Sequence, residues 1–303
     1  MYTMHYVVLP QDDGKQIKRL IRGTMNVSYN QFSKLKAANG FMLDGVSVHA
    51  NHLVHHGQTI CLTLIEKDDS VAADDRPVDI VYEDDDLMVI DKCAPLACQS
   101  SPRQPSNTLE NRLAHHFRDQ SAYTFRPVNR LDKGTSGLMI AAKHAHAQKL
   151  LSAQLHSDSL VRKYFAIVLG CPLPAAGIID QCIRKADGAT IRREVHPDGK
   201  PARTHYETVF SQDGLSLLRL QLETGRTHQI RVHLSAMGCP VLGDFLYGRE
   251  DDRLKGRFAL HSTHLAFTHP QTGKYLTFDS PLPHDLAICI NGELHDLIQN
   301  CKE

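Results

Sequence analysis

Residues 128–142 place a single carboxylate on a glycine-rich turn directly before an apolar segment. Asp132 stands between an arginine and a lysine and is followed closely by Gly-Thr-Ser-Gly. Two glycines allow a tight turn and a close approach by another molecule. The apolar run Leu138–Ala142 is typical of a buried strand. The pattern therefore predicts a carboxylate at a strand edge, kept ionised by its cationic neighbours. Such a group suits a nucleophile or a ligand anchor better than a proton donor.

Charge is distributed unevenly along the chain, although the formal net charge of its 303 residues is zero. A zero net charge argues mildly against a nucleic-acid binder. Residues 14–36, however, contain six cations and no acid, whereas residues 66–86 are strongly acidic. Because local charge reports on a binding face better than the sum does, the first of these segments predicts a basic surface.

The composition is that of a globular protein, with 42% apolar and 22% charged residues, and the length allows one large domain with a satellite or two domains. No signal core or bilayer-spanning run is present in the sequence. The eight cysteines form no C-x-x-C pair, which predicts reduced thiols and a cytoplasmic protein. The histidine pairs at 55–56 and 115–116 lack the spacing of metal ligands, so we expect no metal site.

Residues 1–66 have the pattern of a small separate module. The predicted elements are a helix within 14–23, a helix from the cap Ser28 to about Ala38, a hairpin at 41–48 that turns at Asp-Gly, and a strand at 59–65. This order resembles the S-four-type RNA-binding domain of ribosomal and tRNA-synthetase proteins. The resemblance implies that RNA is bound by the cations of the two helices, which are Lys15, Lys18, Arg19, Arg22, Lys34 and Lys36. A generic α+β module with a solvated basic face is the alternative.

Residues 67–77 are acidic and rich in small residues, which predicts a linker to a second domain over 78–303. That domain is expected to open with a hairpin whose strands cover 80–82 and 87–90. Helices are predicted at 108–119 and 144–154, and strands at 163–169, 177–184, 203–210, 215–222, 227–234 and 274–279.

The string Asn129–Leu138 resembles the catalytic motif of the RluA-type pseudouridine synthases. Many members have histidine in place of Asn129. The essential aspartate of that motif maps onto Asp132. Family members also often have Asn-Lys-Pro where this chain has Asp-Lys-Cys-Ala-Pro at 91–95.

Three further strings resemble the remaining motifs of that family. In the string around Tyr164, the family's tyrosine packs against the target base. The strings at 223–234 and 238–244 match the motif whose arginine pairs with the aspartate, and that arginine maps onto Arg231. On the predicted strand at 227–234, Arg231 shares a face with Thr227 and Gln229 and reaches into a cleft. Leu260 matches a residue that walls the base pocket, although ordinary core packing is nearly as good an interpretation.

The resemblance implies an α+β chain: a pseudouridine synthase fold with a mixed, mostly antiparallel central sheet and a catalytic cleft, plus the small N-terminal α+β RNA-binding domain. It implies an isomerase that acts on ribosomal RNA or tRNA, with Asp132, Tyr164 and Arg231 as catalytic residues. The candidate substrate-binding residues are Arg130, Thr135, Arg226, His228, Gln229 and Leu260. We also expect a monomer with RNA as its partner and no contact with a membrane.

Pseudouridine formation breaks the bond between ribose and the ring nitrogen, turns the uracil and rejoins it through carbon 5. Nothing is oxidised and no group is lost, so we expect no cofactor. Asp132 suits attack on the anomeric carbon, stabilisation of its charge, or removal of a ribose proton, and the sequence leaves these routes open. Tyr164 suits removal of the proton from carbon 5. The target base must leave its stack, and Arg130 is the candidate to fill the vacated space.

Two other classes of function are compatible with parts of the sequence. A non-catalytic RNA-binding or ribosome-assembly factor could keep the fold, but the intact catalytic residues count against it. A glycosidase or nucleoside hydrolase could use Asp132, but it would need a second carboxylate as an acid, and no motif offers one.

Overall fold

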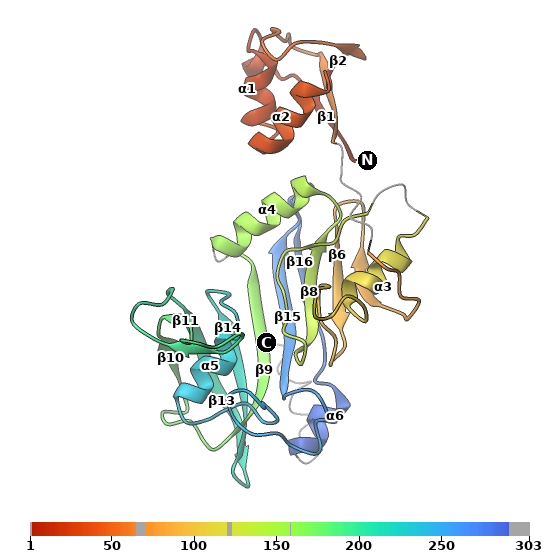
Figure 1. The fold of residues 1–303 in the computed structure, drawn as a ribbon. Coiled ribbons are helices and arrows are strands. Elements are labelled where there is room, and N and C mark those ends of the chain that lie inside the picture. Colours follow the sequence, from red (N-terminus) through yellow and green to blue (C-terminus); the bar gives the residue numbers. More distant parts are fainter. Residues whose placement is uncertain (1, 65–70, 120–122, 158, 291–303) are drawn as a thin grey trace.

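The computed structural model describes residues 2–64, 71–119, 123–157 and 159–290. Within these ranges the chain forms a small four-stranded sheet, a ten-stranded sheet and a two-stranded hairpin. The small sheet and its two helices lie at one end of the molecule (Figure 1). No helix in the described part of the chain is long and apolar enough to cross a bilayer.

The N-terminal sheet has its own hydrophobic core, to which both helices contribute. Its elements are β1 (Tyr2–Val7), the 3-10 helix η1 (Pro10–Asp12), α1 (Ile17–Arg22), α2 (Tyr29–Ala37), β2 (Phe41–Leu43), β3 (Val46–Ser47) and β4 (Thr59–Leu64). The predicted cap is confirmed, because the Ser28 side chain accepts a hydrogen bond from Gln31 N at 3.2 Å. The hairpin turn at Asp44 and Gly45 is confirmed, with φ angles of 49° and 81°.

Strand β1 was not among the predicted elements. It pairs antiparallel with β4 and gives the sheet the order β1-β4-β2-β3. Only alternate positions of this strand face the core, where Met4 is buried between two exposed neighbours. A short alternating segment at a chain end has little to distinguish it from a loop until its partner strand is known.

The large sheet contains most of the remaining strands and has the order β10-β13-β14-β9-β15-β8-β6-β5, with β16 paired to β15 and β7 to β8. Its strands are β5 (Asp79–Glu83), β6 (Leu87–Lys92), β7 (Arg126–Pro127), β8 (Ser136–Ala142), β9 (Val161–Leu169), β10 (Ala176–Asp180), β13 (Arg203–Gln212), β14 (Leu215–Leu222), β15 (Leu260–Thr268) and β16 (Tyr275–Asp279). The other elements are α3 (Leu109–His116), α4 (Ala145–His156), β11 (Ile183–Lys185), β12 (Arg193–Val195), α5 (Gln229–Ala236), α6 (His284–Ala287) and the 3-10 helix η2 (Ile288–Ile290).

Nearly every pairing in the large sheet is antiparallel, and β8 with β15 is the parallel exception in the described residues. The predicted mixed, mostly antiparallel sheet is therefore confirmed. The parallel pair lies in the middle of the sheet, where Ser136 is opposite His261 and Gly137 is opposite Ser262. The predicted catalytic loop leads directly into β8 at this point.

The neighbouring strands β6 and β8 are covered on both faces, because alternate residues enter different cores. Leu87, Val89, Leu138 and Ile140 share a core with α4. Met88, Ile90, Met139 and Ala141 share the other core with α3. This alternation is the period of two that strand geometry imposes. The α3 face also contains Leu131, Tyr164 and Leu260, so the predicted site residues lie on that side of the sheet.

One predicted element is wrong. Residues 227–234 were expected as a strand, but Gln229–Ala236 form helix α5. The alternation of polar and apolar residues fits a strand, yet Gln229 through Leu234 are all buried, which a half-exposed strand would not allow. The predicted strand at 177–184 is also divided, since β10 ends at Asp180 and β11 begins at Ile183.

Residues 72–77 belong to the segment predicted as a linker, and they hydrogen-bond to α3. Asp74 N donates to Asn111 O at 3.0 Å, and Asn111 Nδ2 donates to Ala72 O at 2.7 Å. Arg112 Nη1 donates to Pro77 O at 3.2 Å. This end of the segment is therefore held against the large sheet's helix.

Candidate active site

The loop before β8 is fixed by backbone hydrogen bonds on both sides of Asp132. Thr135 N donates to Asp132 O at 3.0 Å, which closes a tight turn. Leu96 N donates to Lys133 O at 2.9 Å. Because these bonds use the backbone, the side chain of Asp132 is left to face the pocket described below.

The two glycines of the loop are required by close packing inside the chain. A Cβ on Gly137, whose φ is +103°, would lie 2.2 Å from Ser262 O. A Cβ on Gly134 would lie 2.7 Å from the ring of Phe258. The glycines therefore bring the loop against β15 and Phe258, whereas the sequence pattern suggested a tight turn and a close approach by another molecule.

The guanidinium of Arg231 connects two carboxylates. Nη1 donates to Asp132 Oδ2 at 2.9 Å, while Nε and Nη2 donate to Asp244 at 2.7 and 2.9 Å. The guanidinium carbon also lies 4.2 Å from the centre of the Phe258 ring. The side chain of Arg231 is only 4% exposed, whereas that of Asp132 is 27% exposed. The arrangement therefore presents one accessible carboxylate on a buried, fixed cation.

Burial alone would lower the pKa of Arg231, but its hydrogen bonds to Asp244 and the charge of Asp132 outweigh this, and the pKa is raised. The cation is thus retained in an apolar setting. The ionised guanidinium therefore holds Asp132 by a charge-assisted hydrogen bond.

His228 approaches Asp132 from the start of α5. It has a left-handed φ of 59° at the N-cap, and its Nε2 lies 3.9 Å from Asp132 Oδ2. The Tyr247 hydroxyl accepts from Arg193 N at 2.8 Å and lies 2.8 Å from His228 Nδ1, an arrangement that leaves its one proton available for that nitrogen. The proton of a neutral ring is then on Nε2, facing Asp132. Burial lowers the pKa of His228, which favours this neutral form.

Tyr164 and Leu260 form the apolar wall of the same pocket. Tyr164 lies on β9 opposite Ser262 of β15 and is buried. Burial raises the pKa of its phenol, and the neighbouring Arg162 and Ser262 only partly oppose this. The side chain is therefore a neutral phenol near pH 7.

All nine predicted catalytic and substrate-binding residues line one pocket, together with Leu131, Leu222 and Ile230. The nine are Arg130, Asp132, Thr135, Tyr164, Arg226, His228, Gln229, Arg231 and Leu260. They come from the loop before β8, from β9, from the turn into α5 and from β15. The pocket has a volume of about 60 Å³.

A family model described as RNA pseudouridylate synthase matches residues 86–236, a range that contains Asp132, Tyr164 and Arg231. A protein of Bacillus subtilis, the uncharacterized RNA pseudouridine synthase YjbO, is 36% identical over 277 residues, which are 90% of this chain and 98% of that protein. This chain belongs to the RNA pseudouridylate synthase family.

A second relative of the synthase is the ribosomal large subunit pseudouridine synthase D of Vibrio parahaemolyticus. It is 40% identical over 237 residues, which cover 74% of this chain and 73% of that protein. The solved structure of human RNA pseudouridylate synthase domain containing 1 superimposes with a TM-score of 0.57, at 24% identity, over 73% of this chain and 90% of that one. The predicted fold and the predicted activity, the isomerisation of uridine to pseudouridine in RNA, are confirmed.

Several residues that shape the synthase's pocket were not predicted. Asp244 lies in a string that carried the resemblance and Tyr247 lies three residues beyond it, but neither was given a role. Lys92 is buried, and burial lowers its pKa to about 8. Its Nζ donates to Leu96 O at 2.8 Å, and Leu96 in turn bonds to Lys133 as described above. The only feature of the sequence that could have identified these three residues was their position next to the motif residues.

Gln229 has every hydrogen-bonding position of its amide occupied. Its Oε1 accepts from Thr224 Oγ1 at 2.8 Å and Arg226 N at 2.9 Å. Its Nε2 donates to Arg203 O and Thr204 Oγ1, both at 3.0 Å. Gln229 therefore fixes the turn that leads into α5.

The six predicted RNA-binding cations lie outside the pocket, on the N-terminal helices and their flanks. Five of them are exposed and Lys18 is half-buried. Lys15 bonds to Asp12 at 2.8 Å, and Lys18 bonds to Asn51 at 2.7 Å. Of the other four, Arg22 donates to Val27 O, whereas Arg19, Lys34 and Lys36 are exposed and available to bind anions. These six cations are called the basic face below.

One cluster in the described residues has the donor types of a metal site: Asp84, Asp86 and His269. His269 Nδ1 accepts from Gln271 N at 3.2 Å and Thr272 N at 3.1 Å, so its proton is on Nε2. That Nε2 donates to Asp84 at 2.8 Å. A metal would have to replace this proton, and none of the three residues lines the catalytic pocket. The cluster is explained by its own hydrogen bonds.

Proposed function

We propose that Asp132 is the essential carboxylate of this RNA pseudouridine synthase and that Arg231 and Tyr164 act with it. The observation that carries the proposal is the 2.9 Å hydrogen bond from Arg231 to an otherwise accessible Asp132 in a pocket walled by Tyr164 and Leu260. Arg231 orients the carboxylate through this hydrogen bond. The second carboxylate, Asp244, is fully buried and occupied by Arg231, which makes it unsuitable as the acid of a hydrolase.

In the proposed reaction the ionised oxygen of Asp132 acts at the ribose while the bond to the ring nitrogen breaks. Both a covalent and a proton-abstraction route start from this oxygen. The Nε2–H of His228 faces the Asp132 carboxylate and stabilises its negative charge. Tyr164 and Leu260 hold the detached uracil against the sheet, so that it turns without leaving.

Tyr164 is the proposed group that removes the proton from carbon 5 after the sugar is rejoined. Because its pKa is raised, the phenol is protonated at the start. Its oxygen accepts the proton from carbon 5 as its own hydroxyl proton passes to the uracil, whose freed ring nitrogen carries one proton in the product.

The enclosed part of the pocket has a volume of only about 60 Å³, which is less than a uracil with its ribose occupies. Side chains at its mouth therefore move when the flipped nucleotide enters. Arg130 is the proposed mobile group, because it is exposed and its one described contact, to Gln99, is 3.5 Å long. In its new position it fills the space left by the base. Thr135 and Arg226 are proposed to contact the nucleotide from the pocket rim.

We further propose that residues 1–66 are an S-four-type RNA-binding domain, that residues 67–77 connect it to the catalytic domain 78–303, and that the protein is a cytoplasmic monomer. The exposed cations of α1 and α2 support the RNA-binding role. The substrate is ribosomal RNA or tRNA. Large-subunit ribosomal RNA is the first to test, since a relative at 40% identity is named as a synthase for the large ribosomal subunit.

Two experiments test these proposals. Pseudouridine mapping of total RNA from cells lacking the protein identifies the missing positions and hence the RNA. Purified Asp132→Asn is expected to give no pseudouridine in that RNA while its RNA affinity stays within about tenfold, because affinity comes mainly from phosphate contacts. Robust turnover by Asp132→Asn would contradict the role of the carboxylate, and release of free uracil would indicate a hydrolase.

A further inference from the structure

A second pocket, distinct from the catalytic one, lies on the other side of the catalytic loop and is strongly cationic. Its volume is about 500 Å³. The lining residues include four cations and no carboxylate: Arg76, Arg103, Arg112 and Lys133. Gln104, Ser106 and Asn107 add uncharged polar groups. We propose that this pocket binds backbone phosphates of the substrate RNA next to the flipped uridine. The inference rests on the proposed function, since it takes RNA as the substrate.

Two of the cations have no acidic partner in the described residues. Arg103 is exposed and makes no hydrogen bond or ion pair there, and the one described contact of the Lys133 side chain is to Gln104 Oε1 at 3.5 Å. Arg112 is held by Pro77 O, and its Nε is buried without a partner in the part of the chain that is described. Cations gathered without neutralisation repel one another, and a bound anion relieves this repulsion.

The remaining cation is positioned by its neighbours. Arg76 pairs with Asp74 and also donates to Asn107, which ties the end of the 67–77 segment to the loop after Ser101. Arg76 therefore contributes less free charge to the pocket than Arg103 and Lys133. The pocket wall is firm, because Pro95 and Leu96 adjoin the buried Lys92 through the hydrogen bond described above.

The cationic pocket and the catalytic pocket are lined by consecutive residues of the chain. Asp132 lines the catalytic pocket, and the next residue, Lys133, lines the cationic one. A nucleotide whose ribose lies at Asp132 has phosphates on both sides, so one of them is directed toward Lys133. Phosphate contacts fix the register of a nucleic acid without reading its sequence. The cationic pocket therefore sets which nucleotide along the strand is presented to Asp132.

A backbone phosphate is favoured over a small free anion because the pocket is wide and its cations come from three separate segments. These are the 67–77 segment, the loop and helix at 103–112, and the catalytic loop. A lone phosphate would contact only some of them, whereas a strand passing along the pocket meets all of them in turn.

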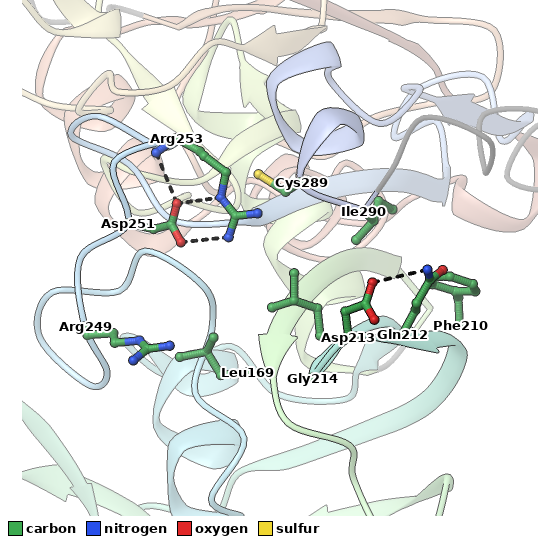
Figure 2. A pocket seen from close by; sticks show the side chains of 11 residues that line it. Leu169, Phe210, Gln212, Asp213, Gly214, Arg249, Asp251, Arg253, Cys289 and Ile290 are labelled. Atoms are coloured by element: carbon green, nitrogen blue, oxygen red, sulfur yellow. Dashed lines mark hydrogen bonds and ion pairs between the residues drawn. The ribbon is translucent and has the colours of Figure 1, made fainter.

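The test compares two double variants of the full-length protein. Arg103→Gln with Lys133→Gln removes the two unpaired cations. Arg249→Gln with Lys274→Gln is the matched control: both residues are exposed, and Arg249 lines a different pocket with Leu169 and Phe210 (Figure 2). Binding is measured with a short oligouridylate at several salt concentrations, since the electrostatic part of binding does not depend on sequence. Melting temperatures verify that both variants fold.

For the pocket variant, the slope of log affinity against log salt is expected to be shallower by about 1.4, because each of the two lost phosphate contacts contributes about 0.7. The control is expected to keep the wild-type slope. On substrate RNA the pocket variant should show a raised KM. An unchanged slope, or an equal fall in the control, would overturn the inference. The inference would also be overturned if inorganic phosphate no longer raised the melting temperature of the pocket variant while the salt slope of its RNA binding stayed unchanged. That result would indicate a small-anion site. Oligouridylate binding requires no turnover, so these outcomes are independent of the Asp132→Asn result.

Discussion

Asp244 accepts two hydrogen bonds from Arg231, at 2.7 and 2.9 Å, and is completely buried. Its Oδ1 also accepts from Leu246 N at 3.1 Å and Tyr247 N at 3.3 Å. The backbone after Asp244 therefore fixes the carboxylate, and the carboxylate fixes the plane of the guanidinium. Only Nη1 is left to reach Asp132, so Asp244 is a positioning residue for the catalytic pair.

Asp244→Asn is expected to lower kcat between about tenfold and a hundredfold, since a hydrogen bond to a charged group contributes about 1.5–3 kcal/mol. RNA affinity should be unchanged, because Asp244 is buried away from phosphates. Arg231→Lys should lose activity similarly, as an ammonium cannot make the two-pronged contact to Asp244 and reach Asp132 as well. Single-turnover kinetics and RNA titration measure both quantities. Asp251→Asn, which breaks a half-exposed pair with Arg253, is the control and should keep wild-type kcat.

Tyr164→Phe is expected to lower turnover by about a hundredfold or more, the usual contribution of a group that transfers a proton. The ring remains to pack on the uracil, so RNA binding and stability should be nearly unchanged. Substrate deuterated at carbon 5 should react more slowly with this variant, because removal of that proton becomes limiting. Tyr206→Phe, a buried tyrosine outside the pocket, is the control. Full turnover by Tyr164→Phe would show that the phenol oxygen takes no part.

Activity is expected to be unchanged by a strong chelator, because the proposed chemistry uses only Asp132, Tyr164 and Arg231. The assay is pseudouridine formation before and after dialysis against the chelator, with magnesium tested separately because it also folds RNA. Loss of activity that zinc restores would show that the histidines or the cluster of Asp84, Asp86 and His269 had been misinterpreted.

Deletion of residues 1–66 is expected to leave a folded domain that still isomerises uridine but binds RNA more weakly. The N-terminal core is separate from the cores of the large sheet, so its removal exposes little of them. If about four cations of the basic face meet phosphates, the salt slope should fall by roughly three, at about 0.7 per contact. The single-turnover rate on saturating RNA should change little. An unchanged slope would favour the generic α+β module.

Stability is expected to decrease as the pH falls from 7 to 5. Burial lowers the pKa of both His146 and His261 to about 4, against about 6.5 in the unfolded chain. Between these values the unfolded state binds more protons, so acidification favours unfolding. Each histidine accounts for about 2 kcal/mol at pH 5. Urea unfolding at pH 7 and pH 5 measures the loss, and His261→Gln should reduce it. A pH-independent stability would contradict the neutral, buried state of these rings.

His261 illustrates why that state is neutral. Arg257 Nη2 donates to Ser136 Oγ at 2.9 Å, so the Ser136 hydroxyl donates onward to His261 Nδ1, also at 2.9 Å. The remaining proton on Nε2 is directed at Ser280 O, 3.3 Å away. A second ring proton would have to displace the hydroxyl of Ser136. Acidification therefore acts at the junction of β8 and β15.

The sequence was sufficient to predict which residues meet at the site, but not how the chain brings them there. The strings around Asp132, Tyr164, Arg231 and Leu260 identified nine residues, and all nine line one pocket. The strand expected for Arg231 is a helix, however, because a left-handed residue at His228 redirects the chain. An alternating pattern over eight residues does not reveal the φ angle of one residue among them. The burial of residues 229–234, which favours the helix, depends on segments that are distant in the chain.

The supporting residues were missed for a related reason. Asp244 has no local sequence feature that distinguishes it from a turn aspartate, and its role depends on Arg231, 13 residues away in the chain. The cationic pocket combines residues from 76 to 133, and three of its four cations lie in segments that were interpreted as linker, loop and helix. Such groupings depend on tertiary contacts, which a single sequence does not contain.

The parallel pairing of β8 with β15 determines when the enzyme becomes active during its own synthesis. Asp132 and Arg231 are 99 residues apart, and the Ser136–His261 contact spans 125 residues. Contacts of such long range form late, because the intervening chain must first be ordered. A nascent chain on the ribosome therefore has no assembled catalytic centre until β15 has emerged. The enzyme cannot modify RNA near its own site of synthesis before that point, which separates its production from its activity.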